Sequence, residues 1–308
     1  MPEPKRDNLT GRTPMLIEPF SLETANQAQA ALARECGISR PWTNSIGMEF
    51  APIPAGKFTR GYNPENQRIL KELPRDVHNY HSTIISLPLL VGVHRITQAQ
   101  HLAMTGKSPS YYSSTGRLSS RVVGVDTSRF PVDSVSWFDC IEACNELGKL
   151  EGIAPYYQFN GDVARLKSGT IIEGNVTILG GSGYRLLTSA EWEYCCRAGT
   201  TTLYYFGNVL EGPRREACSV PNPVGTDGPN HFGLYDLSAH LEEWVFDAMN
   251  YNSYGKYVGK VANDPVDLES DDLERVTRGL NSAFRGCQPA GDSAENIGYR
   301  VCRTIDIS

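Results

Sequence analysis

The most informative stretch of this chain is GYRLLTSAEWEYCCRAGTTTLYYFG, at residues 183–207. Thr188 is followed three residues later by Glu191, which is typical of a helix that begins with a capping box. The predicted helix ends at Gly199, because glycine readily adopts the left-handed backbone found just after a helix. The sequence therefore predicts both ends of this helix, within a stretch that is rich in aromatic residues.

Large aromatic side chains and a few charged residues are expected to form the core around this helix. We expect four aromatic side chains to be buried: Trp137, Trp192, Tyr194 and Trp244. Burial of one such ring stabilises a fold by several kcal/mol. Arg185 is expected to form a buried or half-buried polar network with Glu191 or Glu193, so these charges are assigned to structure rather than to catalysis.

Two further helices are predicted from the same signature at their first residues. Thr97 is followed by Gln100 at the spacing of a capping box, and that helix is expected to end at Gly106. Another helix is predicted from Ser136 to about Leu150. Because the starting signals agree, these helix boundaries are well determined by the sequence.

The first forty residues are expected to form an appendage to the main domain. Residues 1–20 contain many prolines and charges, which predict a disordered or loosely attached arm. Residues 21–36 predict a helix with Ser21 as its N-cap, and its alanine-rich face is expected to dock on the main domain. The predicted organisation is an arm and docking helix at 1–40 and a main domain at 41–308.

The rest of the chain favours short strands and loops. Short strands are expected within 44–58 and 83–93, and a hairpin with glycine-rich turns is expected at 156–184. After Gly199 long helical patterns vanish, and loops with short strands such as 299–304 are expected. This order of elements predicts an α+β fold that is rich in loops.

Composition excludes some classes of function. The formal net charge of −6 and the pI of about 5.6 argue against a nucleic-acid surface, which needs a basic face. No stretch approaches the ~20 apolar residues that span a bilayer. The polar start of the chain contains no apolar signal region, so a cytoplasmic location is predicted, and we expect a monomer.

Eight cysteines are present, and without an export signal they are expected to be reduced. Cys140 and Cys144 lie four residues apart on one helix face, so they could bind a metal. No second pair of this kind accompanies them, and packed apolar thiols are the favoured interpretation.

Six segments, in order along the chain, resemble the formylglycine-generating-enzyme (sulfatase-modifying factor) family. They are NSIGMEFAPIPAGKFTRG (44–61), ITQAQHLAMTG (96–106), FPVDSVSWFDCIEACNELG (130–148), GYRLLTSAEWEYCCRAGTTTLYYFG (183–207), NHFGLYDLSAHLEEWVFD (230–247) and RVTRGLNSAF with NIGYRVCR (275–303). The matches cover about residues 41–304. The resemblance implies a variant of the C-type lectin fold with little regular structure for its size.

The resemblance also shows where family chemistry is missing. Active members carry two cysteines after an Arg-Gly-Gly-Ser-aromatic run, and such thiolate pairs suit Cu(I). Here the run at 278–284 reads RGLNSAF, so Phe284 fills the first cysteine position and the second falls near Pro289. Cys287 lies close by but alone. No copper is therefore expected; the alternative is a divergent cysteine-modifying oxidase that uses Cys287 and one other thiol.

Calcium is the one cofactor that the resemblance leaves open. By resemblance, the carboxylates of Asp236 and Glu243 and the carbonyls of Ala239 and Leu241 would bind it. Calcium takes about six to eight oxygen ligands, and mixed carboxylates and carbonyls suit it. The family usually has Gly-Asn where this chain has Ala-His at 239–240. In the alternative interpretation, the two carboxylates bond to loop amides or pair with an arginine.

Residues 280–295, LNSAFRGCQPAGDSAE, depart from the family although the sequence on either side matches it well. We call residues 280–295 the divergent segment. A departing patch near the end of the chain, held in a rigid frame, resembles the variable proteins of diversity-generating retroelements. In those systems an error-prone reverse transcriptase rewrites the 3′ end of the gene.

That resemblance implies a non-catalytic protein that binds a ligand of unknown identity, expected to be another protein, through exposed side chains. The residues predicted to face the ligand are Asn281, Ser282, Phe284, Arg285, Gln288, Asp292, Ser293 and Glu295. Phe284 and Arg285 are expected to be the anchors, because aromatic and guanidinium groups dominate binding hot spots. In the alternative interpretation the divergent segment is an ordinary surface loop.

Overall fold

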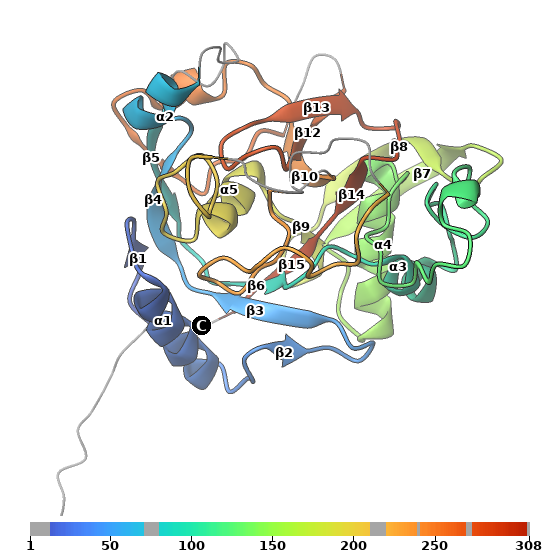
Figure 1. Cartoon of the computed structure of the whole chain (residues 1–308), viewed down its shortest axis with the longest axis horizontal. Helices are drawn as coiled ribbons and strands as arrows, with labels where there is room; N and C mark the ends of the chain where they lie inside the picture. Colours follow the sequence, from blue (N-terminus) through green and yellow to red (C-terminus); the bar gives the residue numbers. More distant parts are fainter. Residues whose placement is uncertain (1–12, 71–79, 210–219, 239–240, 269–272, 307–308) are drawn as a thin grey trace, which may run out of the picture.

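The computed structural model describes residues 13–70, 80–209, 220–238, 241–268 and 273–306 (Figure 1). The helices in these ranges are α1 (Leu22–Glu35), α2 (Pro64–Ile69), α3 (Gln98–Thr105), α4 (Trp137–Leu150) and α5 (Ser189–Arg197), with short 3-10 turns at Ser119–Arg121 and Tyr254–Tyr257. The strands are β1 (Leu16–Ile17), β2 (Trp42–Thr43), β3 (Glu49–Ile53), β4 (Gly56–Arg60), β5 (His81–Ile85), β6 (Leu89–Gly92), β7 (Tyr157–Arg165), β8 (Ile171–Ile178), β9 (Arg185–Leu186), β10 (Glu242–Ala248), β11 (Val261–Asn263), β12 (Glu274–Arg278), β13 (Gly286–Pro289), β14 (Ile297–Tyr299) and β15 (Val301–Thr304).

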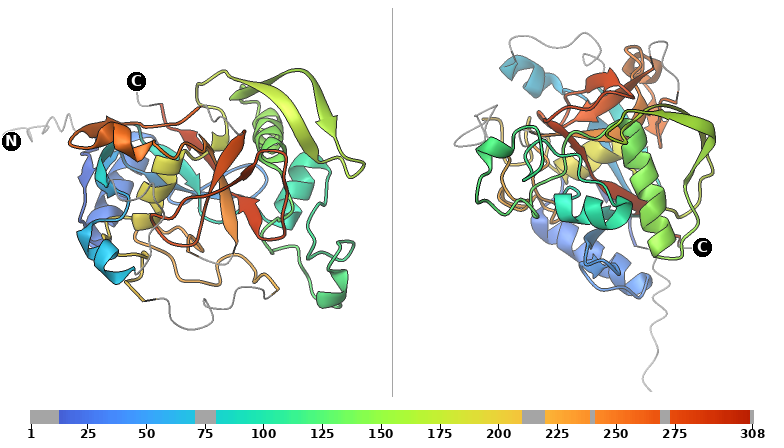
Figure 2. Two further views of the ribbon diagram at one scale, coloured as in Figure 1. Left: turned by 90° about the horizontal axis from the view of Figure 1, so that it is seen from above. Right: turned by 90° about the vertical axis from the view of Figure 1, so that its right-hand side faces the viewer.

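The described strands form four sheets. Their orders are β2-β3-β6-β15-β9, β1-β4-β5-β11, β13-β12-β10-β14 and the β7-β8 hairpin. In the third sheet β10 pairs antiparallel with β12 and parallel with β14, so Glu243 lies opposite both Arg278 and Gly298. The β7–β8 hairpin projects from the body beside α4 (Figure 2). No helix in the described part of the chain is both long and apolar enough to cross a bilayer.

The helix starts follow the sequence signals. Thr97, Ser136 and Thr188 each close a full capping box, in which the cap side chain and the side chain of the third helical residue bond each other's backbone amides. Ser21 accepts a hydrogen bond from the Thr24 amide at the start of α1. These four predictions are confirmed, as is the hairpin of β7 and β8.

The N-terminal part of the chain is attached more firmly than predicted. Leu16 and Ile17 pair in parallel with β4, and Leu16 is only 5% exposed. The apolar side chain of Leu16 is buried, which removes it from water and fixes the backbone. The prediction of a loose arm is therefore wrong for these residues, while residues 1–12 lie outside the described ranges. Helix α1 docks as predicted, with Ala25 and Leu32 buried.

The final third contains more strand than its loop-like composition predicts. In β10, Trp244 and Phe246 pack into one hydrophobic cluster and Val245 packs into the other. Because both faces of this strand are buried, it lacks the apolar–polar alternation from which strands are recognised. The three buried tryptophans expected in the core, Trp137, Trp192 and Trp244, are confirmed.

A fully buried carboxylate, Glu243, connects the sheets to each other. Its Oε1 atom accepts hydrogen bonds from Arg95 Nε at 3.0 Å and from Arg300 Nη2 at 3.0 Å. Its Oε2 atom accepts from Trp192 Nε1 at 2.9 Å and from Arg300 Nε at 3.2 Å. Four hydrogen bonds from three side chains therefore compensate the loss of water around this charge.

A second buried carboxylate, Glu193, repeats this arrangement one helical residue away from Trp192. Arg197 donates to its Oε1 atom at 2.9 Å, Arg278 donates to its Oε2 atom at 2.9 Å, and the Gly61 amide also donates to Oε1 at 2.7 Å. The Arg278 guanidinium also lies over the Trp192 ring, 4.9 Å from its centroid. We call Glu193, Glu243, Trp192 and their arginines the buried charge network.

The predicted pairing of Arg185 is resolved in favour of Glu191. Two parallel hydrogen bonds of 2.7 and 2.8 Å join the guanidinium to this carboxylate. Glu193, the other candidate, is committed to Arg197 and Arg278 instead. Arg185 and Glu191 therefore form a separate bidentate pair at the edge of the core.

The charges of the buried charge network determine how the stability of the fold changes with pH. Burial alone would raise the pKa of Glu243, but the nearby Arg300 and Arg95 guanidiniums outweigh burial, so its pKa lies below the ordinary value of 4.5. A carboxyl group with a lowered folded-state pKa stabilises the fold above its unfolded pKa. That contribution is lost as the pH falls through the folded-state pKa.

We expect Glu243→Gln to lower the free energy of unfolding by about 3–5 kcal/mol at pH 7, because Arg95 and Arg300 would be left buried without a counter-charge. The variant should also lose less stability than the wild type as the pH falls below about 4. Urea unfolding at pH 7 and at pH 3–4 measures both effects.

Glu146→Gln is the matched control, because Glu146 is partly exposed and pairs with Lys149 at 3.5 Å on α4. Its effect should be below about 1 kcal/mol. Equal effects of the two substitutions would contradict a structural role for the buried charge network.

Candidate ligand-binding site

After Leu280, which is 54% exposed, the divergent segment continues with residues that face inward. Asn281 is 6% exposed and Ser282 is 0% exposed. The Asn281 side-chain oxygen accepts hydrogen bonds from the Tyr62 hydroxyl at 3.0 Å and from the amides of Ala283 and Phe284 at 3.0 and 2.9 Å. This oxygen therefore organises a tight turn inside the protein.

Arg278, from the buried charge network, forms hydrogen bonds to the same turn. Its Nη2 atom donates to the Ser282 carbonyl at 2.6 Å, and its Nη1 atom donates to the Ala283 carbonyl at 3.3 Å. The Ser282 amide in turn donates to the Leu203 carbonyl at 2.9 Å. The start of the divergent segment is therefore fixed by the core.

Arg285 is also buried, with 4% of its surface exposed. Its guanidinium lies over the Tyr254 ring at 5.1 Å and donates to the Asn250 carbonyl at 3.4 Å. The expectation that Asn281, Ser282 and Arg285 face a ligand is therefore corrected. These three side chains are buried, and their polar groups bond to side chains and backbone carbonyls of the protein itself.

The second half of the divergent segment does reach the surface. Gln288 lies on the edge strand β13 and is exposed, as are Asp292 and Glu295. Phe284 and Ser293 are partly exposed. Five of the eight predicted residues are therefore accessible, and three of these are fully on the surface.

A groove of about 1190 Å³ runs between this half and the β7–β8 hairpin. We call it the hairpin groove. Its lining comes from α4, both hairpin strands, β10, β12, the residues that precede β12 and the divergent segment, namely Trp137, Phe138, Asp162, Val163, Ala164, Ile172, Glu173, Gly174, Asn175, Val176, Ala248, Leu268, Leu273, Glu274, Arg275, Pro289, Ala290, Gly291 and Asp292. Of the residues predicted to bind a ligand, Asp292 is the one in this lining.

Backbone contacts hold the walls of the hairpin groove together. The Trp137 amide at the start of α4 donates to the Ala290 carbonyl at 3.0 Å, and the Ala290 amide donates to the Leu273 carbonyl at 3.2 Å. Gly291 approaches the hairpin so closely that a Cβ atom there would lie 2.1 Å from the Ile172 carbonyl oxygen. Only glycine fits at this contact.

Charges around the hairpin groove are mostly negative. Its lining contains four carboxylates, those of Asp162, Glu173, Glu274 and Asp292, and one guanidinium, that of Arg275. The Arg275 guanidinium is already engaged, because it stacks on Trp137 at 4.0 Å and donates to the Phe246 carbonyl at 3.3 Å. The sequence predicts the hairpin but not the groove beside it, because residues from distant parts of the chain meet here.

The thiols of the described residues are arranged as packed side chains. Cys140 and Cys144 are fully buried on α4, and burial raises the pKa of each well above the ordinary value. Cys287 is half-buried on β13, 3.5 Å from the Tyr251 hydroxyl, and burial also raises its pKa. Cys302 lies in a different sheet and is fully buried.

The copper site of active family members needs two thiolates, and Cys287 is the one cysteine of the divergent segment. At the family's copper positions stand Phe284 and, nearby, Pro289. In the described ranges no group of three or more His, Cys, Asp or Glu side chains is placed to hold a metal ion. These donors do not fit the copper site of the family.

The calcium ligands named from the sequence have other partners. Glu243 is bonded by arginines, and the Leu241 carbonyl accepts from Arg95 Nη2 at 2.5 Å. The Asp236 carboxylate accepts from the amides of Gly225 at 2.7 Å and Asp227 at 3.2 Å. Ala239 lies outside the described residues. The alternative with loop amides and arginine therefore describes these carboxylates, and they do not fit a calcium ion.

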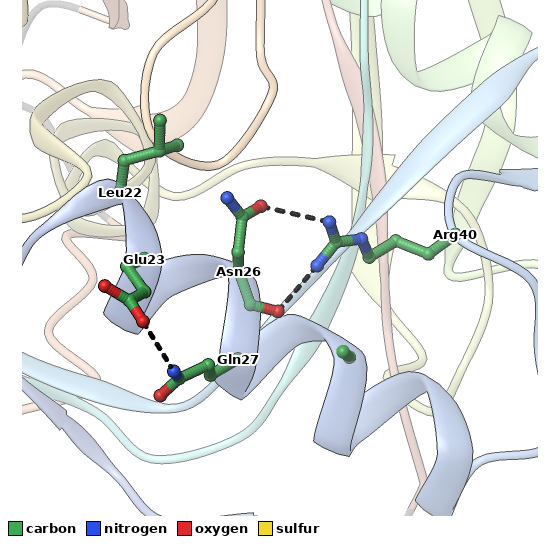
Figure 3. A pocket seen from close by; sticks show the side chains of 6 residues that line it. Leu22, Glu23, Asn26, Gln27 and Arg40 are labelled. Carbon is green, nitrogen blue, oxygen red and sulfur yellow. Dashed lines mark hydrogen bonds between the residues drawn. The ribbon is translucent and has the colours of Figure 1, made fainter.

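A second hollow, of about 420 Å³, lies on the outward face of α1 (Figure 3). Arg40 donates there to the Asn26 carbonyl at 2.6 Å and to its side-chain oxygen at 3.0 Å, and Gln27 donates to Glu23. The polar groups drawn in this hollow are bonded to one another and it contains no residue of the divergent segment, so we favour the hairpin groove as the candidate site.

Comparison with known proteins places the chain among relatives of several kinds. It is 28% identical over 184 residues to the chaperone protein LppX of Paenibacillus barcinonensis, covering 51% of this chain and 61% of that protein. It is 28% identical over 145 residues to the formylglycine-generating enzyme of Thermomonospora curvata, covering 41% of this chain and 46% of the enzyme. The chain thus spans less than two thirds of the length of these relatives.

The fold is shared with a solved structure, Treponema denticola variable protein 1. The two have a TM-score of 0.67 at 21% identity, and the match covers 85% of this chain and 97% of the other. This likeness confirms the predicted α+β, loop-rich, C-type-lectin-like fold. Residues 43–305 match the family described as the sulfatase-modifying factor enzyme 1-like domain. Because this match spans most of the chain, the protein belongs to the formylglycine-generating-enzyme (sulfatase-modifying factor) family.

Proposed function

We propose that this protein is a non-catalytic ligand-binding member of its family, whose recognition surface combines the exposed half of the divergent segment with the hairpin groove. The observation that carries the proposal is the division of the divergent segment. Residues 281–285 are anchored to the core, whereas Gln288, Asp292 and Glu295 are exposed and bordered by a groove. A surface on a rigid support binds with little loss of conformational entropy.

The chemistry of the thiols supports the same proposal. The family oxidation needs two thiolates, and the donor set here offers Cys287 with a raised pKa and a tyrosine neighbour. A place in a diversity-generating retroelement rests on the divergence of residues 280–295 between well-matched flanks. In that setting the exposed positions would be the ones that are rewritten, and we expect the ligand to be another protein.

We expect the exposed and buried positions of the divergent segment to respond differently to substitution. Changing Gln288, Asp292 and Glu295 to alanine should alter the free energy of unfolding by no more than about 0.5 kcal/mol each. Asn281→Ala should cost about 1–3 kcal/mol, because the Tyr62 hydroxyl and two amides would lose their acceptor. Thermal or urea unfolding compares the variants one by one, and a single surface variant as unstable as Asn281→Ala would favour an ordinary structural loop.

We expect no stoichiometric binding of Cu(I) in competition with a chelator, and no oxygen uptake in the presence of copper and a cysteine-containing peptide. An active formylglycine-generating enzyme serves as the positive control in both assays. Binding of one Cu(I) per chain that disappears in Cys287→Ser would instead support the oxidase. Cys36→Ser is the matched control, because Cys36 is also partly exposed but lies at the end of α1.

A further inference from the structure

We infer that the hairpin groove binds a peptide segment that contains lysine or arginine together with apolar side chains. This inference rests on the proposed function, because it names the class of ligand for the same surface. The size of the groove, its apolar lining residues and the sign of its charges point to this class of ligand.

Size favours a peptide over a small molecule. Sites for drug-sized ligands have volumes of about 300–1,000 Å³. The hairpin groove, at about 1190 Å³, lies above that range, and its lining comes from both the β7–β8 hairpin and β12. A segment of polypeptide with several side chains fills such a space better than a single compact ligand does.

Apolar side chains supply part of the lining of the groove. Trp137 and Phe138, from the first turn of α4, are buried there, and Val163 and Val176 of the hairpin are partly buried against the same hydrophobic cluster. The side chains of Leu268 and Leu273 are 51% and 78% exposed, so these groups contact water when the groove is empty. An apolar side chain of a ligand would remove them from water, which favours binding.

The charges decide which peptides fit. Asp162, Glu173 and Asp292 are exposed, and Glu274 is partly exposed, so their carboxylates remain available to a ligand. The single cation, Arg275, is held by Trp137 and a carbonyl. A peptide with lysine or arginine gains attraction from these carboxylates, whereas an acidic peptide or a nucleic acid is repelled.

A phage-displayed library of random twelve-residue peptides, panned against the whole chain at low salt, tests this inference. We expect the selected peptides to be enriched in lysine and arginine beside aliphatic or aromatic residues. Fluorescence anisotropy of selected peptides should show weaker binding at higher salt, because the charges are solvent-exposed. Glu173→Gln and Asp292→Asn should each weaken binding about two- to fivefold, and Glu146→Gln, on an outer surface of α4, should have no effect.

Ala164→Trp locates the binding. Ala164 is exposed on β7 and lines the groove, so a tryptophan there should block it without disturbing the core. If the selected peptides bind the wild type but not Ala164→Trp, and are not enriched in lysine or arginine, the inferred class of ligand is wrong and the proposed function still stands. Selection of no peptide, or of peptides that ignore Ala164→Trp, would overturn the groove as a peptide site.

Discussion

Glu193 and Glu243 lie in the interior without contact to water, and each is bonded by two arginines. Arg197 is four residues from Glu193 on the same helix, whereas Arg278, Arg95 and Arg300 come from distant parts of the sequence. Trp192 joins them, since it donates to Glu243 and carries the Arg278 guanidinium on its ring. Removing one partner from such a buried pair leaves a charge that neither water nor protein can stabilise. The stability of the rest of the structure therefore depends on all these partners being in place.

The position of this network explains how a divergent segment fits into a stable fold. Arg278 lies two residues before the segment and Arg300 lies five residues after it, so both ends are fixed by buried ion pairs. Between them, the turn at 281–285 is held by Arg278 and Tyr62, and the strand β13 pairs with β12. The side chains beyond this support point to solvent and to the hairpin groove. A surface built in this way can change its side chains while the backbone below it stays the same.

The sequence predicted the features that depend on neighbouring residues. Capping boxes lie within four residues, so the starts of α3, α4 and α5 were predictable, and the family resemblance gave the fold. The burial of Asn281 was not predictable, because its partner Tyr62 is 219 residues away in the sequence. The family resemblance implies a calcium ligand at Glu243, but Arg95, 148 residues away, pairs with this carboxylate. The hairpin groove was missed for the same reason, since its walls meet only in three dimensions.

A fixed frame that carries a surface free to vary should leave its mark on the gene, which can be read by sequencing this gene and its flanking DNA from several sister strains. We expect amino-acid differences concentrated at exposed positions such as Gln288, Asp292 and Glu295, with Asn281, Ser282 and Arg285 unchanged. We also expect a reverse-transcriptase gene and an adenine-rich template repeat nearby. Differences spread evenly over residues 41–304, with neither companion present, would contradict this expectation.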